Sequence, residues 1–491
     1  MDEDSFRPGV SHNRPAHARS PFADGLRRRD NPAERTGRSM ASRKSERVAT
    51  GGIFADPELK IWSREGDHHH GDGMRLAPPV EPASDIWLRI GRYLLYACAF
   101  VGGWHLLRVG GQNITLSDVA FLACFAVMLG NGRLSVSPFG GASSLWYLAV
   151  GTMLLGLFAS TALNGDLSRW LVVAVQYTLA LCLIPMLLNS YPRDITARLP
   201  LIFCLGVVVS QLIGIVSINL FSYAQTSILL GTKFISGSGR LGALAGEANW
   251  NGASIASAMP MLIYSLVRGH IRVVPAVLCA IILAWGLLLS ASFTGFCATL
   301  LSTLIALFLL GPKYVARLAL VVAVGGGLFV AAGAPLPETF QKRVAGAITS
   351  GDLDQAGTFT GRAELIKEAW IMAEDTTLIG LGVDRFREES MHGAPVHQLY
   401  LLVWTEGGFI AFVGLLSILG LLIALGINAV RIDRVGGAMA TGVIAVLLVY
   451  TFTSAHMYAR LWMMPVMVAL SAVYARRSEA DDAETLSPVR R

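Results

Sequence analysis

The feature that most constrains this chain is a series of apolar stretches that begins at Ile86 and continues to residue 475. Each stretch has roughly the 20 residues that a helix needs to cross the hydrocarbon core of a bilayer. In that core every backbone polar group must be paired internally, which helices achieve. The chain is 53% hydrophobic and only 15% charged, so lipid must surround most of it. The pattern predicts an all-α, polytopic membrane protein.

We expect about twelve transmembrane helices, with one large loop before the tenth. The predicted segments are 86–107, 115–130, 144–162, 168–189, 198–220, 249–267, 271–290, 293–310, 314–333, 397–428, 436–455 and 458–475. Residues 1–85 lack apolar periodicity and are rich in Arg, Ser, Gly and Pro, which predicts a disordered tail. The membrane domain is therefore expected at 86–475, and residues 476–491 form a short second tail.

Lysine and arginine are unevenly divided between the two sets of short loops. One set is rich in them and holds Arg133, Arg193, Arg198, Arg268, Arg272, Lys313, Arg317, Arg431, Arg434, Arg476 and Arg477. The other set holds Arg108, Arg169, Lys233 and Arg240. Because basic loops stay in the cytoplasm, both termini are predicted to be cytoplasmic. The long segment 334–396 then lies on the outer side, which is the periplasm in a bacterium.

The loop 334–396 carries many charged residues, and long loops in compact proteins are usually functional or disordered. Within it, residues 360–374 are predicted to form an amphipathic helix with Leu365, Ala369, Trp370 and Met372 towards one side. His397 follows the loop. It is predicted to lie about one turn into the next helix, where the helix amides keep its ring neutral, and a neutral imidazole can act as a general base. The alternative is an interfacial histidine that bonds loop backbone.

Three further residues are candidates for the same site. Arg240 and Arg362 are permanent cations with forked donors suited to phosphate oxygens. Glu406 lies inside the apolar segment that follows His397, where an acidic residue is costly unless it is paired or functional. The two arginines have a simpler explanation as snorkelling or ion-paired side chains.

Short motifs in this region resemble those of the O-antigen ligase and polysaccharide polymerase superfamily. They are Arg362-x7-Trp370, Leu378-Ile379-Gly380-Leu381-Gly382-x3-Phe386, and His397-Gln398-Leu399-Tyr400-Leu401-x4-Glu406-Gly407-Gly408. Upstream, Arg240-Leu241-Gly242 and Glu247-Ala248-Asn249 are similar to the family's Arg-x-x-Gly and Asp-Pro-Asn region. Two departures stand out: Gln398 replaces the family's usual Asn, and Ser292-Phe293 replaces its Ser-Arg pair.

The resemblance implies a bacterial inner-membrane enzyme that transfers a glycan from undecaprenyl diphosphate to a sugar hydroxyl, with inversion and without a metal or other cofactor. It implies His397 and Glu406 as catalytic residues. It also implies five substrate-binding residues, which are Arg240, Arg362, Asn249, Gln398 and Tyr400. Expected partners are the lipid-linked glycan, the bilayer and a candidate chain-length regulator protein, with no nucleic acid.

Three functions and a purely structural role remain open from the sequence, although a membrane scaffold would not need His397 and the arginines near one face. Polymerisation of exopolysaccharide or O-antigen repeat units is favoured, because nothing in the sequence points to lipid A. Ligation of a finished O-antigen onto lipid A core is the alternative within the family. A polysaccharide or lipid transporter is the alternative of another class, but such proteins usually show an internal repeat and midmembrane polar residues. No repeat is evident, and Asp118 and Glu406 form no obvious relay.

Overall fold

The computed structural model describes residues 83–475 except 109–113, 237, 332, 334, 352–358 and 456–459. The predicted tails lie outside the described residues, apart from residues 83–85, which open the first helix. Within the described ranges the protein is all-helical, and its only β pairings are the isolated bridges Arg108–Thr115 and Ile235–Leu241. The predicted all-α class is confirmed.

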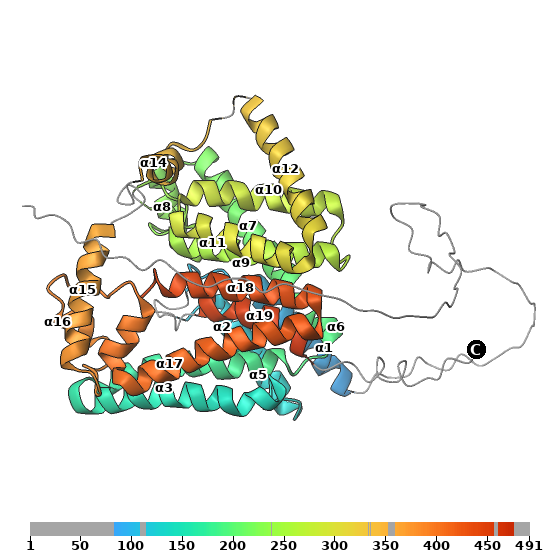
Figure 1. Cartoon of the computed structure of the whole chain (residues 1–491). Coiled ribbons are helices and arrows are strands. Elements are labelled where there is room, and N and C mark those ends of the chain that lie inside the picture. Colours follow the sequence, from blue (N-terminus) through green and yellow to red (C-terminus); the bar gives the residue numbers. More distant parts are fainter. Residues whose placement is uncertain are drawn as a thin grey trace, which may run out of the picture. The chain divides into compact units, whose positions relative to one another are not determined.

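Every predicted apolar segment coincides with a helix or a continuous helical run (Figure 1). These are α1 (Ala83–Phe100), α2 (Leu116–Gly130), α3 (Ser143–Asn164), α4 (Leu167–Thr178) with η2 (Leu179–Leu183) and α5 (Ile184–Leu188), α7 (Leu199–Leu220), α9 (Ala248–Val267), α10 (Val273–Ser290), α11 (Phe293–Leu310), α12 (Pro312–Ala331), α17 (Leu399–Ile432), α18 (Arg434–Thr451) and α19 (Arg460–Tyr474). Among the described residues, seven helices are long and apolar enough to cross a membrane. A multi-pass protein is therefore supported, and the number of about twelve spans stays a prediction.

Short helices fill the connection between α7 and α9 and the connection between α12 and α17. They are α8 (Tyr223–Leu230), η3 (Ala243–Ala245), α13 (Glu338–Phe340), η4 (Gln341–Ala345), α14 (Gly346–Ser350), α15 (Phe359–Asp375) and α16 (Arg385–Glu389), while η1 (Gly140–Ala142) and α6 (Arg193–Thr196) lie in other connections. Figure 1 shows α8, α14, α15 and α16 at the same end of the long helices. We call this the Arg240 end, since the loop that carries Arg240 also lies there.

Helix α15 is amphipathic as predicted, but one polar residue lies on its buried side. Leu365 and Ala369 are buried, and Trp370 is 50% exposed. The Trp370 ring meets that of Trp404 of α17 edge to face at 5.9 Å, and its Nε1 donates to the Glu374 carboxylate at 2.6 Å. Glu368, which was predicted to lie away from the apolar face, is buried and accepts bonds from the loop at residues 390–391.

Helices α3 and α17 lie side by side along their length (Figure 1). Glycines allow this approach: a Cβ atom on Gly156 would overlap the backbone of Ala411, and one on Gly414 would overlap the backbone of Met153. Membrane helices commonly use small residues in this way, because apolar burial does not drive their association. The contact fixes the position of α17, the helix that follows His397.

Helix α17 is broken near its start at Gly408, where φ is 69° and ψ is −173°. Such a backbone conformation is open to glycine and costly for other residues. Near the break the loop backbone takes over the hydrogen bonds: Leu381 N donates to Thr405 O, and Gly382 N donates to Glu406 O, both at 2.9 Å. The loop at 380–382 is therefore attached to the first turns of α17 through backbone groups.

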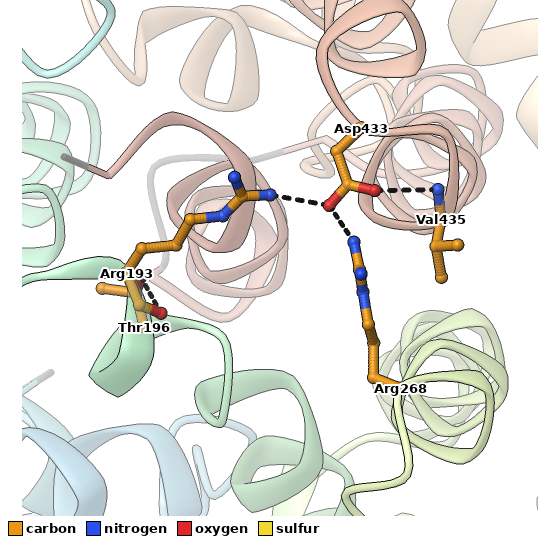
Figure 2. Close-up of polar contacts among 5 residues, drawn as sticks. All are labelled: Arg193, Thr196, Arg268, Asp433 and Val435. Atoms are coloured by element: carbon orange, nitrogen blue, oxygen red, sulfur yellow. Dashed lines mark hydrogen bonds and ion pairs between the residues drawn. The ribbon is translucent and has the colours of Figure 1, made fainter. Parts of the chain in front are cut away.

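The opposite end of the long helices is held by one carboxylate (Figure 2). Asp433, between α17 and α18, accepts from Arg193 Nη2 at 2.7 Å and pairs with Arg268. Its second oxygen accepts from Val435 N at 3.1 Å and caps α18. The Asp433 side chain is 9% exposed, so this group links α6, the end of α9 and the α17–α18 turn. We call this the Asp433 end.

The α3–α17 contact predicts a position-specific effect of alanine. Gly414→Ala should lower the free energy of unfolding by about 1–3 kcal/mol, because the methyl group has no room beside Met153. Gly420→Ala, in the same helix with open space around it, should be neutral or up to about 1 kcal/mol more stable. Thermal unfolding of both variants in one detergent measures the difference, and equal melting temperatures would contradict it.

The Asp433 cluster predicts a second effect on stability. Asp433→Asn should cost about 1–2 kcal/mol, because two arginines lose their shared carboxylate while solvent still screens them in part. The exposed Asp194 lies beside the same arginines without a described ion pair to either. Asp194→Asn should stay within about 0.5 kcal/mol of wild type. The same unfolding assay applies, and a larger loss in Asp194→Asn would overturn the assignment.

Candidate functional site

Arg240 is fixed in place by two acceptors from different helices. Its Nε donates to the carbonyl of Ser290 at 3.0 Å, and its Nη2 donates to Asn249 Oδ1 at 2.9 Å. Ser290 is the last residue of α10, where free carbonyls and the helix dipole favour a cation. The guanidinium is thus held between the end of α10 and the start of α9. Two of the predicted site residues, Arg240 and Asn249, are in direct contact.

Asn249 connects Arg240 to two further helices. Its Oδ1 also accepts from Ser292 Oγ at 3.0 Å, and its backbone carbonyl accepts from Tyr450 Oη at 2.8 Å. The absence of a side chain at Gly252 permits this, because a Cβ atom there would lie 3.1 Å from both hydroxyl oxygens. The starts of α9 and α11 and the end of α18 therefore meet at Asn249.

Two further arginines and one carboxylate lie near enough to Arg240 to act on its charge. Arg343 of η4, Arg362 of α15 and Glu247 all exert electrostatic effects on Arg240. Burial, and after it Arg343, lower the pKa of Arg240, while Glu247 raises it. Burial likewise lowers the pKa of Arg362, and Glu247 opposes this. Since an arginine remains protonated in proteins, the cluster is a concentrated positive charge. Sequence reasoning did not find Arg343, which lies in no recognised motif.

His397 lies outside the helix in which the sequence analysis placed it. Helix α17 begins at Leu399 with Gln398 as its N-cap, so the expectation that His397 sits one turn inside is wrong. The side chain is half-buried. Gln398 makes no side-chain cap bond, and Tyr400 Oη bonds Thr451 Oγ1 at 2.9 Å.

The start of α17 and the start of α9 touch the same helix end. Tyr400 contacts Thr451, and the preceding residue, Tyr450, contacts Asn249. His397 and Arg240 therefore belong to the same end of the bundle, although nearly 160 residues separate them. Tyr450 and Thr451, which are neighbours on α18, therefore connect the residues around Arg240 with the residues around His397.

Glu406 lies in a different group of residues. It is buried beside the backbone of Asp384 and Phe386, and Asp384 pairs with Arg169. Its backbone carbonyl accepts from Ser160 Oγ at 2.6 Å. The described contacts of Glu406 thus hold the 380–386 segment and α3 to α17, and its assignment as a catalytic residue stays a prediction.

A buried histidine lies near Arg240 on the loop after α1. His105 is 9% exposed, and its ring meets that of Trp250 edge to face at 4.9 Å. Burial, followed by the charges of Arg108, Arg460 and Lys233, lowers the pKa of His105 to about 3. Sequence reasoning missed it because a lone histidine after an apolar helix carries no motif. Within the described ranges, no three His, Cys, Asp or Glu side chains are grouped to hold a metal ion.

The low pKa of His105 predicts a pH dependence of stability. Below pH 6.5 the unfolded chain binds a proton at this residue, whereas the folded protein does not until about pH 3. Folding is therefore progressively destabilised as the pH falls through this range. In His105→Gln the free energy of unfolding should fall less steeply with decreasing pH, by up to about 1.4 kcal/mol per pH unit. Unfolding midpoints from pH 7 to pH 4 test this, and parallel curves for wild type and variant would contradict it.

The site was compared with known proteins. Residues 278–416 match the family model described as O-Antigen ligase. Comparison with curated proteins gives no match. The matched segment contains Arg343, Arg362, His397 and Glu406, while Arg240 and Asn249 precede it. Residues 278–416 are therefore similar to the O-antigen ligase family, which confirms the resemblance of the chain to the O-antigen ligase and polysaccharide polymerase superfamily.

Proposed function

We propose that this protein transfers a glycan from undecaprenyl diphosphate to a sugar hydroxyl at the periplasmic face of the bacterial inner membrane, and that the reaction polymerises exopolysaccharide or O-antigen repeat units. The observation that carries the proposal is Arg240, fixed by Asn249 beside Arg343 and Arg362. A diphosphate is the leaving group that such a cluster suits.

The arginine cluster stabilises the leaving group as the glycosidic bond breaks. Two donors of Arg240 are used by Ser290 and Asn249, which fix the guanidinium plane. Its Nη1 makes no hydrogen bond with the described residues, so it is directed to phosphate oxygens in the proposal. Prepositioned cations in a partly buried site gain more from developing negative charge than they would in water. Arg362 and Arg343 add further positive charge, as a metal ion does in other transferases.

His397 takes the acceptor proton in the proposed mechanism. The acceptor oxygen attacks the anomeric carbon, the bond from that carbon to the diphosphate oxygen breaks, and the hydroxyl proton moves to the imidazole. A single displacement inverts the anomeric configuration. Gln398 and Tyr400 flank the acceptor, and Asn249 orients Arg240. Glu406 acts by positioning the 380–386 segment.

The distribution of charge supports the orientation. The Asp433 end gathers the basic residues Arg193, Arg268 and Arg434, and basic loops face the cytoplasm. We therefore assign the Arg240 end to the periplasm and both termini to the cytoplasm. A chain-length regulator that acts on the product would meet the protein at the periplasmic end.

Ligation onto lipid A core is the second candidate. The description of the matched family, O-Antigen ligase, favours it. Both reactions use the same leaving group and the same base, so they differ only in the acceptor.

Glycan analysis in a deletion strain tests the proposal. Wild type should restore the glycan. His397→Ala should reduce transfer about 10²–10⁴-fold through loss of the base, and Arg240→Lys about 10²–10³-fold through loss of the fixed fork. Accumulated single lipid-linked repeats identify a polymerase, whereas accumulated long lipid-linked chains with unmodified lipid A identify a ligase.

A matched control separates the site from general charge effects. Arg362→Gln and Lys367→Gln each remove one positive charge from α15, and Lys367 is exposed. When both variant proteins are present in the membrane at the wild-type level, only Arg362→Gln should reduce glycan production. Normal glycan in both Arg362→Gln and His397→Ala would refute the proposed site and favour a transporter.

A further inference from the structure

A cavity of about 390 Å³ lies beside Arg240 and is not used in the mechanism above. The loop after α1, the segment at residues 232–236 and the start of α9 form its walls. Its chemically distinctive lining residues are His105, Arg108, Lys233, Arg240, Glu247 and Trp250. We call it the Trp250 cavity.

The walls of the Trp250 cavity are held by backbone hydrogen bonds. Leu106 N donates to Leu244 O at 2.8 Å, which ties the loop after α1 to η3. Gly242 N donates to Phe234 O at 2.8 Å, which ties the segment that carries Lys233 to the segment that carries Arg240. Side chains that point into a cavity with fixed walls can bind a ligand without a large ordering cost.

One wall of the cavity is aromatic. The Trp250 ring meets the rings of His105 and Trp462 in edge-to-face geometry, with centroid distances of 4.9 Å and 6.3 Å. The face of an indole is electronegative and attracts partially positive C–H groups. The C–H groups on one face of a sugar ring meet this requirement, while the ring hydroxyls can bond the polar side chains around them.

The lining carries more positive than negative charge. Arg108, Lys233 and Arg240 face a single carboxylate, that of Glu247. The Glu247 carboxylate is also partly occupied, since it accepts from Trp250 N at 2.9 Å. His105 adds no charge near neutral pH, because its pKa is lowered to about 3 by burial and then by Arg108, Arg460 and Lys233.

We propose that the Trp250 cavity is a saccharide subsite that takes a sugar ring bearing a carboxylate, with the ring against Trp250 and the carboxylate near Lys233 and Arg108. The proposal rests on the proposed glycan transfer and narrows its substrate to acidic glycans. Arg240 lies at the border between this cavity and the cluster with Arg343 and Arg362. A sugar in the cavity would therefore be adjacent to the diphosphate.

Binding of matched probes to the purified full-length protein in nanodiscs tests the subsite. Methyl glucuronide and methyl glucoside differ by one carboxylate, and NMR titration gives both dissociation constants. The glucuronide should bind about five- to tenfold more tightly than the glucoside, because its carboxylate adds one charge-assisted hydrogen bond. In Lys233→Gln the ratio should fall below about twofold. Lys233 is exposed and its side chain makes no described hydrogen bond or ion pair, so the variant should fold.

Lys313→Gln, at the Asp433 end, is the matched control and should keep the wild-type ratio. Equal binding of the two probes, no binding of either, or an unchanged ratio in Lys233→Gln would overturn the proposal. Inorganic pyrophosphate is a third probe. If Lys233→Gln weakens pyrophosphate binding but not the preference for the glucuronide, the cavity holds the diphosphate and the subsite assignment is wrong.

The probe-binding experiment and the glycan assay in the deletion strain can fail independently of each other. If the strain assay shows transfer and the probes show no preference for the glucuronide, only the subsite proposal fails. If the His397→Ala and Arg362→Gln variants make normal glycan, the transfer proposal fails, whatever the probes show.

Discussion

The close packing of α17 against α3 is the contact on which the arrangement of the site depends. In lipid, helices gain little from hiding apolar surface from one another, so they associate where small residues let backbones touch. Gly156 and Gly414 provide that approach. Because α17 follows His397 and leads through Asp433 into α18, the position of α17 determines where the ends of both helices lie. The polar contacts of the Arg240 end are built on this apolar framework.

The site itself is assembled from helix ends rather than from helix faces. Arg240 bonds the last carbonyl of α10, Asn249 opens α9, and Ser292 caps α11. Helix ends have unsatisfied backbone groups and partial charges. These groups can orient polar side chains, so no further charged side chain has to be buried for that purpose. In the family the serine is followed by arginine, whereas Phe293 stands here. Arg343, which reaches the cluster from η4, supplies a cation that the sequence comparison could not anticipate.

Much of the fold could be predicted from the sequence because hydrophobic length is a local property. The boundaries of α11 were predicted to the residue, and those of α2 and α9 to within one. The contacts of the site could not be predicted, since they join residues far apart in the chain. The contact between Tyr450 and Asn249 spans 201 residues. Glu368 was predicted to lie away from the apolar face of α15, but it is buried because Ser390 and Met391 donate to its carboxylate, a contact that periodicity does not reveal. The assignment of His397 and the arginines to catalysis stays a prediction.

The break at Gly408 links the 377–382 segment and the start of α17 so closely that they must evolve together. Phe409 N, which would bond the carbonyl of Thr405 in an unbroken helix, donates instead to Thr377 O, and Thr405 O accepts from Leu381 N. Each of these bonds joins one segment to the other, so shifting either segment leaves a backbone donor or acceptor without its partner. An insertion in 377–382 would therefore need a matching change in the helix. Recombination between relatives that exchanges substrate-binding loops should preserve residues 377–409 as one block.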